Sequence, residues 1–128
     1  MYINKRENHM FENVQDVVRV LDEATILASR AAEKYMHDEL QGKDAYPCGF
    51  AWVNIREFNG KKIRANSWLG KALAEFGVRK SEYEKCFQVW NPGQVNCQNV
   101  DAKYAGAKVY ADHLKKFGFS ASAGERLD

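Results

Sequence analysis

The stretch QVWNPGQVNCQNVDAK, Gln88–Lys103, contains the sharpest change of local pattern in the chain. A β-prone run ends at Trp90, an Asn-Pro-Gly triplet typical of a tight turn follows, and a polar loop leads into a helix. Asn99, or Asn96 in a longer version of the helix, has the side chain that an N-cap requires. The stretch therefore predicts a strand, a turn and a helix in succession.

The elements on either side of this stretch complete an α+β fold. The predicted order is α-β-β-α-β-α-β, with a small, largely antiparallel sheet and helices on one face. We expect a single domain over residues 1–128, made of a long N-terminal helix at 11–41 and an α+β core at 46–128. The expected elements are helices at 11–41, 68–76 and 100–117 and strands at 50–58, 61–65, 83–90 and 119–123.

The segment GFAWVNIREFNGKKIRA predicts a β-hairpin. Asn59-Gly60 favours a two-residue type I′ turn, in which both residues have positive φ. Alternation along the first strand separates two sets of side chains. One face carries Ala51, Val53 and Ile55, and the other carries Phe50, Trp52, Asn54 and Arg56.

The N-terminal helix has an apolar stripe whose middle is alanine, including Ala24, Ala28 and Ala31. A helix of this length would span about 40 Å, which exceeds what a core of this size usually covers. We therefore expect part of this helix to pair with another subunit, so that the protein is a dimer or larger.

Composition and spacing indicate a cytoplasmic protein. Of the 128 residues, 45% are hydrophobic and 28% charged, and no apolar run approaches the roughly 20 residues of a membrane span. The N-terminus lacks the apolar centre of a secretory signal. Cys48, Cys86 and Cys97 have no CxxC spacing and are expected to be free thiols. No phosphate-loop, nucleophile-elbow or metal-ligand spacing is present, so we expect no cofactor, no metal site and no catalytic residue.

Charge is distributed unevenly along the chain. Residues 46–80 carry seven Lys and Arg against two acidic residues, a balance of +5, whereas residues 1–45 have a balance of −3. The basic segment indicates an anionic ligand, either a nucleotide or nucleic acid, although a solvated lysine-rich surface explains it equally well. The candidate ligand-binding residues are Trp52, Arg56, Lys61, Lys62, Arg64, Trp90, Gln94, Gln98, Asn99 and Lys103.

Two other functions fit the sequence. One is a protein-interaction module that inhibits a host factor and oligomerises through the N-terminal helix. The other is a small enzyme that uses one cysteine or a histidine–carboxylate pair. A non-enzymatic binding protein is favoured because no sequence motif supports the enzyme.

Several blocks of the sequence resemble small proteins of tailed bacteriophages. These blocks are YPCGFAWV, VWNPG, DAKYAGAKVYADHLKKFG and the terminal SAGERLD, and the resemblance covers about residues 45–128. It implies an accessory or counter-defence protein that acts in the host cytoplasm. The group supplies no established activity, so no catalytic residue is carried over from it.

Overall fold

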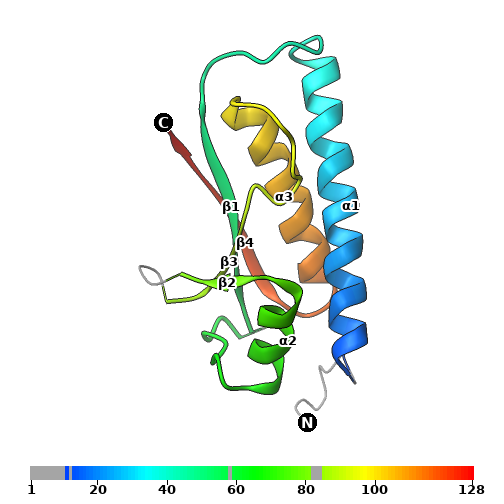
Figure 1. Cartoon of the computed structure of the whole chain (residues 1–128), viewed down its shortest axis with the longest axis vertical. Helices are drawn as coiled ribbons and strands as arrows, with labels where there is room; N and C mark the ends of the chain where they lie inside the picture. The colour runs from blue at the N-terminus through cyan, green and yellow to red at the C-terminus, as the bar shows by residue number, and fades with distance from the viewer. Residues whose placement is uncertain (1–10, 12, 58, 82–84) are drawn as a thin grey trace.

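The computed structural model describes residues 11, 13–57, 59–81 and 85–128. The chain forms an antiparallel four-stranded sheet with a long helix at its side (Figure 1). The elements are α1 (Val14–Asp38), β1 (Gly49–Arg56), α2 (Trp68–Phe76), β2 (Arg79–Lys80), β3 (Phe87–Trp90), α3 (Val100–Lys116) and β4 (Ser120–Leu127). The predicted α+β class, with its small antiparallel sheet and long N-terminal helix, is confirmed.

Each helix begins where a polar side chain caps its first turn. The side chains of Asn13, Ser67 and Asn99 accept hydrogen bonds from backbone N–H groups at the starts of α1, α2 and α3. These bonds satisfy donors that have no partner inside the helix. Gly77 ends α2 in the left-handed conformation with φ 101°, which glycine adopts without steric cost. For α3 the predicted cap Asn99 is confirmed, and the longer version of the helix from Asn96 does not form.

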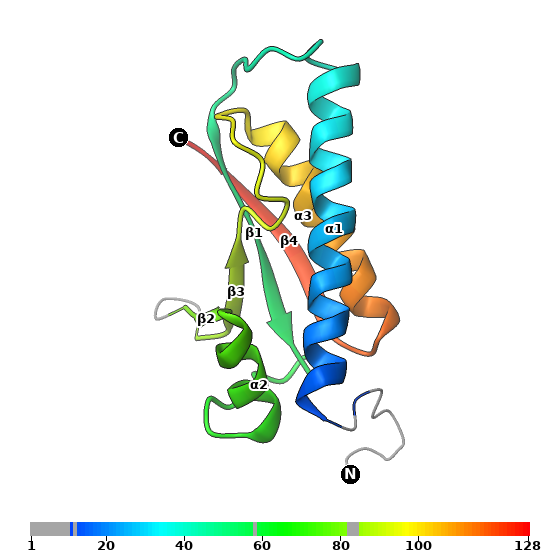
Figure 2. The same ribbon diagram turned by 45° about the vertical axis from the view of Figure 1, so that its right-hand side comes forward.

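The strand order in the sheet is β2-β3-β1-β4, so β1 is an inner strand with antiparallel neighbours on both sides. Its predicted alternation is confirmed, because Ala51, Val53 and Ile55 are buried against the helices. Helix α3 packs on β1 and β4, and α1 packs along α3 (Figure 2). The core therefore lies between these two helices and one face of the sheet.

The hairpin prediction is wrong in its second strand. Residues 61–64 are not a strand, and the Glu57 N–H bonds the Lys61 carbonyl in a turn instead. Gly60 has the positive φ that the predicted turn requires, 84°, but the second strand does not form. The reason is that β3 and β4 occupy both edges of β1, which leaves no edge for a hairpin partner. Phe58 lies outside the described residues.

The alanine stripe of α1 is covered by its own chain. Ala24, Ala28 and Ala32 are fully buried, and Ala28 faces two glycines. A Cβ atom at Gly93 or Gly106 would lie 2.9 or 3.0 Å from the Ala28 carbonyl oxygen. These glycines thus allow the turn after β3 and helix α3 to approach α1 closely. The stripe is not the free surface for another subunit that the sequence had indicated.

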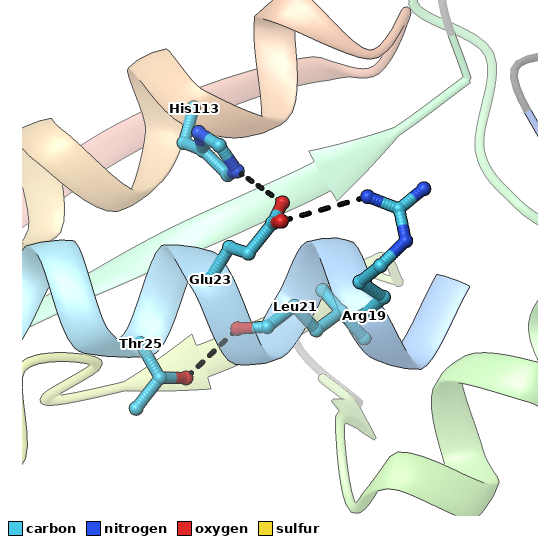
Figure 3. A network of polar contacts seen from close by, with 5 residues as sticks. All are labelled: Arg19, Leu21, Glu23, Thr25 and His113. Carbon is cyan, nitrogen blue, oxygen red and sulfur yellow. Dashed lines mark hydrogen bonds and ion pairs between the residues drawn. The ribbon is translucent and has the colours of Figure 1, made fainter. Parts of the chain in front are cut away.

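A polar contact also joins α1 to α3 (Figure 3). His113 Nε2 lies 3.2 Å from Glu23 Oε1, and Arg19 Nη1 lies 3.5 Å from the other oxygen of that carboxylate. In the next turn of α1, the Thr25 hydroxyl donates to the Leu21 carbonyl over 3.0 Å. These contacts lie at the edge of the helix pair, where they help to orient α1 relative to α3 beside the buried apolar contacts.

Candidate functional site: the open face of the sheet

The face of the sheet opposite α1 and α3 carries a row of aromatic and polar side chains. Strand pairing places residues that face each other across two strands on the same side of the sheet. The row follows the outward positions of β1 and their partners on β3 and β4. Its members are Phe50, Trp52, Asn54 and Arg56 from β1, Gln88 and Trp90 from β3, and Ser122, Gly124 and Arg126 from β4.

Two tryptophans stack at the centre of this row. Trp52 and Trp90 are direct partners across β1 and β3, with ring centroids 4.9 Å apart and planes inclined by 26°. The Trp52 ring also lies across Gly124, its partner on β4, where a Cβ atom would be 2.7 Å from the indole. Trp90 is the outer ring of the stack, and 50% of its surface is exposed.

A chain of amide hydrogen bonds holds the outer tryptophan in place. The Trp90 indole N–H donates to Gln88 Oε1 over 3.0 Å, and Gln88 Nε2 donates to Asn54 Oδ1 over 2.6 Å. Gln88 is only 7% exposed, so these bonds are shielded from water. The ring of Trp90 is therefore fixed in orientation while its outer surface stays open.

Two cations flank the aromatic end of the row. Lys103 Nζ lies 5.5 Å and the Arg126 guanidinium carbon 5.3 Å from the centre of the Phe50 ring, both within cation–π range. Phe50 itself meets Trp90 edge to face, with centroids 6.1 Å apart. Lys103 also donates to the Gly49 carbonyl over 2.9 Å, which positions its charge beside the rings.

The predicted basic residues lie at the opposite end of β1. Arg56 is the last outward residue of the strand, and Lys61, Lys62 and Arg64 are exposed in the loop that follows. Ile63 is fully buried and fastens this loop to the core. The row therefore runs from an aromatic end with two cations to a basic loop.

The three predicted polar residues from the loop before α3 have different environments. Asn99 is 1% exposed and structural, because its side chain caps α3 and donates to the Ala45 carbonyl. Gln98 is exposed, and its backbone N–H bonds Asp44. Gln94 is exposed beside a pocket that also includes Trp90. The structure thus brings Trp52, Trp90 and Lys103 to the open face of the sheet, whereas Asn99 has a structural role in capping α3.

Six members of the row were absent from the predicted set, namely Phe50, Asn54, Gln88, Ser122, Gly124 and Arg126. Phe50 had been placed on the outward face of its strand, but Arg126 carried no local signal at all. It enters the site because β4 pairs Arg126 with Phe50, a register that joins residues far apart in sequence. The predicted last strand, 119–123, ends before Arg126, whereas β4 continues to Leu127, so only the observed pairing shows which aromatic residue Arg126 meets.

The described chain offers little for thiol or metal chemistry. Burial raises the pKa of the Cys97 thiol, with the Asp44 carboxylate adding to the rise, so the reactive thiolate is disfavoured. His37 and His113 contact the carboxylates of Asp38 and Glu23. No group of three or more potential metal ligands occurs within the described ranges.

Comparisons with protein families, curated proteins and solved structures find no match for this chain. Among the described residues, none of the helices has the length and apolar character needed to cross a membrane.

Proposed function

We propose that the chain binds single-stranded nucleic acid across the open face of its sheet. The observation that carries this proposal is the Trp52–Trp90 stack, whose outer ring is half exposed and held by a buried amide chain. Every base has a flat π-face, so an exposed and oriented indole is a general stacking platform. A second aromatic ring, Phe50, lies beside it with two cations placed to meet phosphates.

The length of the row favours a strand over a single nucleotide. From Phe50 to Arg56 the outward positions of β1 extend for about 20 Å. Successive nucleotides in one strand of a duplex advance by about 3.4 Å, so the row has room for several of them. Bases would stack at the aromatic end, and the phosphates that follow would reach Arg56 and the basic loop.

The first test is binding of labelled 12-nucleotide single strands, measured by fluorescence anisotropy. Trp90→Ala removes the outer stacking surface and should weaken binding by about 5- to 150-fold, which corresponds to 1–3 kcal/mol per stacked base. Trp68→Ala is the matched control, because Trp68 is 46% exposed on α2, away from the row. Equal loss in both variants, or loss in neither, would contradict the stacking role.

Salt dependence tests the contribution of the charges. Each neutralised phosphate contributes about −0.7 to the log–log slope on single strands and about −0.9 on duplex DNA. Replacing Arg56, Lys61, Lys62 and Arg64 together by Ala should therefore flatten the single-strand slope by up to about 2.8, and a duplex held by these four would show a slope of about −3.6. A small nucleotide as the ligand would show a weaker salt dependence. An unchanged slope would make the basic loop a solvated surface.

A protein partner is the second candidate, favoured by the long outer edge of β4. This strand of eight residues pairs with β1 alone, and no described strand covers its other edge. An extended peptide of another protein could add to such an edge through main-chain hydrogen bonds. The resemblance to phage proteins would place either partner in the host cytoplasm. If no nucleic acid binds, a host protein inhibited through this edge becomes the first hypothesis.

A further inference from the structure

The outer edge of β4 lacks the features that keep a free strand edge unpaired. Its eight residues, Ser120–Leu127, pair one to one with β1, so the strand contains no bulge. It also contains no proline and no lysine, which natural edge strands use to prevent pairing. Within the described part of the chain, no strand or loop forms backbone hydrogen bonds to its outer side. The edge is therefore a template for another extended strand.

Two hydrogen bonds show which backbone groups of β4 point outward. The Asp128 N–H donates to the Cys48 carbonyl over 3.0 Å, on the β1 side. The Asn91 N–H bonds the Ala51 carbonyl, so residue 51 points toward β3 and its neighbours in β1 point toward β4. Alternate residues of an antiparallel strand point their backbone groups in opposite directions, so the even-numbered residues of β4 face β1. The outward N–H and C=O groups belong to Ala121, Ala123, Glu125 and Leu127.

We propose that a second copy of this chain pairs its own β4 with this edge, antiparallel about a two-fold axis at Gly124. Opposite residues must both point their backbone groups at the partner or both away, so a symmetric register is centred on a residue. The axis at Gly124 places Ala123 opposite Glu125 of the second copy, and Ala121 opposite Leu127 of the second copy. All four outward residues then pair, with about eight main-chain hydrogen bonds.

The neighbouring registers are less favourable. An axis at Ala123 pairs only three of the four outward residues and leaves Leu127 beyond the β4 of the second copy. An axis at Glu125 or Arg126 places two like charges directly opposite, which destabilises a sheet. Gly124 at the axis forms a non-hydrogen-bonded pair, where the Cα atoms of the two strands come within about 4.5 Å, and it has no side chain to clash there. This self-complementarity favours a second copy over an unrelated peptide.

The pairing also joins the open faces of the two sheets. Trp90, Trp52 and Gly124 lie in one row across β3, β1 and β4, and the second copy continues this row in reverse order. The two Trp52 positions would be three strand spacings, or about 14 Å, apart. Leu127, which is 64% exposed, gains a cross-strand neighbour. The inference goes beyond nucleic-acid binding and does not depend on it, because it rests on β4 alone.

Sedimentation velocity over a concentration series tests the association. We expect the wild type to reach twice the mass of the chain, whereas Glu125→Pro should stay a monomer. Proline removes the outward N–H of residue 125, and this N–H does not bond β1, so the sheet itself is kept. Glu125→Ala is the matched control, because it removes the same exposed side chain but keeps the N–H, and it should dimerise like the wild type.

Disulfide crosslinking tests the register. The axis at Gly124 places Ser122 opposite Arg126 of the second copy, with Cα atoms about 4.5 Å apart, which is within reach of a disulfide. An oxidised mixture of Ser122→Cys and Arg126→Cys should therefore form covalent dimers. Either variant alone should not, because equal positions lie about 13 Å apart along the strands. The oxidised wild type controls for the native thiols of Cys48, Cys86 and Cys97.

Each outcome decides the inference. A wild type that stays monomeric at every concentration overturns it and leaves the β4 edge open to a peptide of another protein. A dimer that persists in Glu125→Pro, or a mixture of the two cysteine variants that does not crosslink, overturns it as well. Should Glu125→Pro fail to fold, the crosslinking experiment decides by itself. Nucleic-acid binding by Trp90→Ala tests the proposed function separately, and the expected dimer is the same whichever result it gives.

Discussion

Gly124→Ala is predicted to displace the Trp52 ring of the tryptophan stack without unfolding the protein. The new Cβ atom would lie 2.7 Å from Trp52 Cε2 and 2.8 Å from Nε1 of the same ring. Ordinary carbon contacts begin near 3.5 Å, so the indole must move by about 0.8 Å or more. Overpacking of this kind costs about 1–3 kcal/mol of the free energy of unfolding. The ring can lift because it lies on the open face of the sheet.

Urea denaturation gives the free energy of unfolding, and near-UV circular dichroism reports the coupled Trp52 and Trp90 rings. Ser122→Ala is the matched control, since Ser122 is an exposed outward residue of the same strand. In a Trp52→Ala background the clash is absent, and Gly124→Ala should instead stabilise the strand by about 0.5–1 kcal/mol. Equal destabilisation in both backgrounds would refute the proposed contact.

Three further predictions concern the core. Asn99→Ala should lower the free energy of unfolding by about 2–3 kcal/mol, because it removes the α3 cap and leaves buried backbone groups unpaired. Chemical denaturation measures this change, and a loss of under about 0.5 kcal/mol would contradict the structural role. Gly106→Ala should destabilise the protein by about 1–3 kcal/mol, because the new Cβ atom would lie 3.0 Å from the Ala28 carbonyl oxygen. At an ordinary mid-helix position the same change would be stabilising. A higher melting temperature of the variant would refute this prediction. Burial raises the pKa of Tyr110, so the folded state keeps a proton that the unfolded state loses above about pH 10. The free energy of unfolding should therefore fall above that pH by up to about 1.4 kcal/mol per pH unit. Urea denaturation from pH 9 to 11 should show a flatter decline in Tyr110→Phe.

Local signals in the sequence predicted most of the helices and strand faces. Asn99 caps α3 as expected, because capping depends only on residues within one turn. The inward and outward faces of β1 followed from its alternation. The hairpin at Asn59-Gly60 failed because the choice of strand partner is made by the whole sheet, and β3 and β4 pair with β1 in its place.

The candidate site was predicted in its components but not in its arrangement. Trp52, Trp90 and Lys103 were expected to contact a ligand. No local sequence pattern, however, shows that the two indoles stack or that Arg126 lies beside Phe50. Such features depend on register and burial, which arise from contacts across the chain.

The position of β1 inside the sheet has a consequence for synthesis on the ribosome. Strand β1 ends at residue 56, but β4, which covers one of its edges, ends at residue 127. At about 5–20 residues per second, roughly 4–14 s pass between the translation of these two strands. During this interval the nascent chain presents an apolar, aromatic strand without its final neighbour. Helix α3, which packs on β1, ends at residue 116, so this cover of β1 is also translated late.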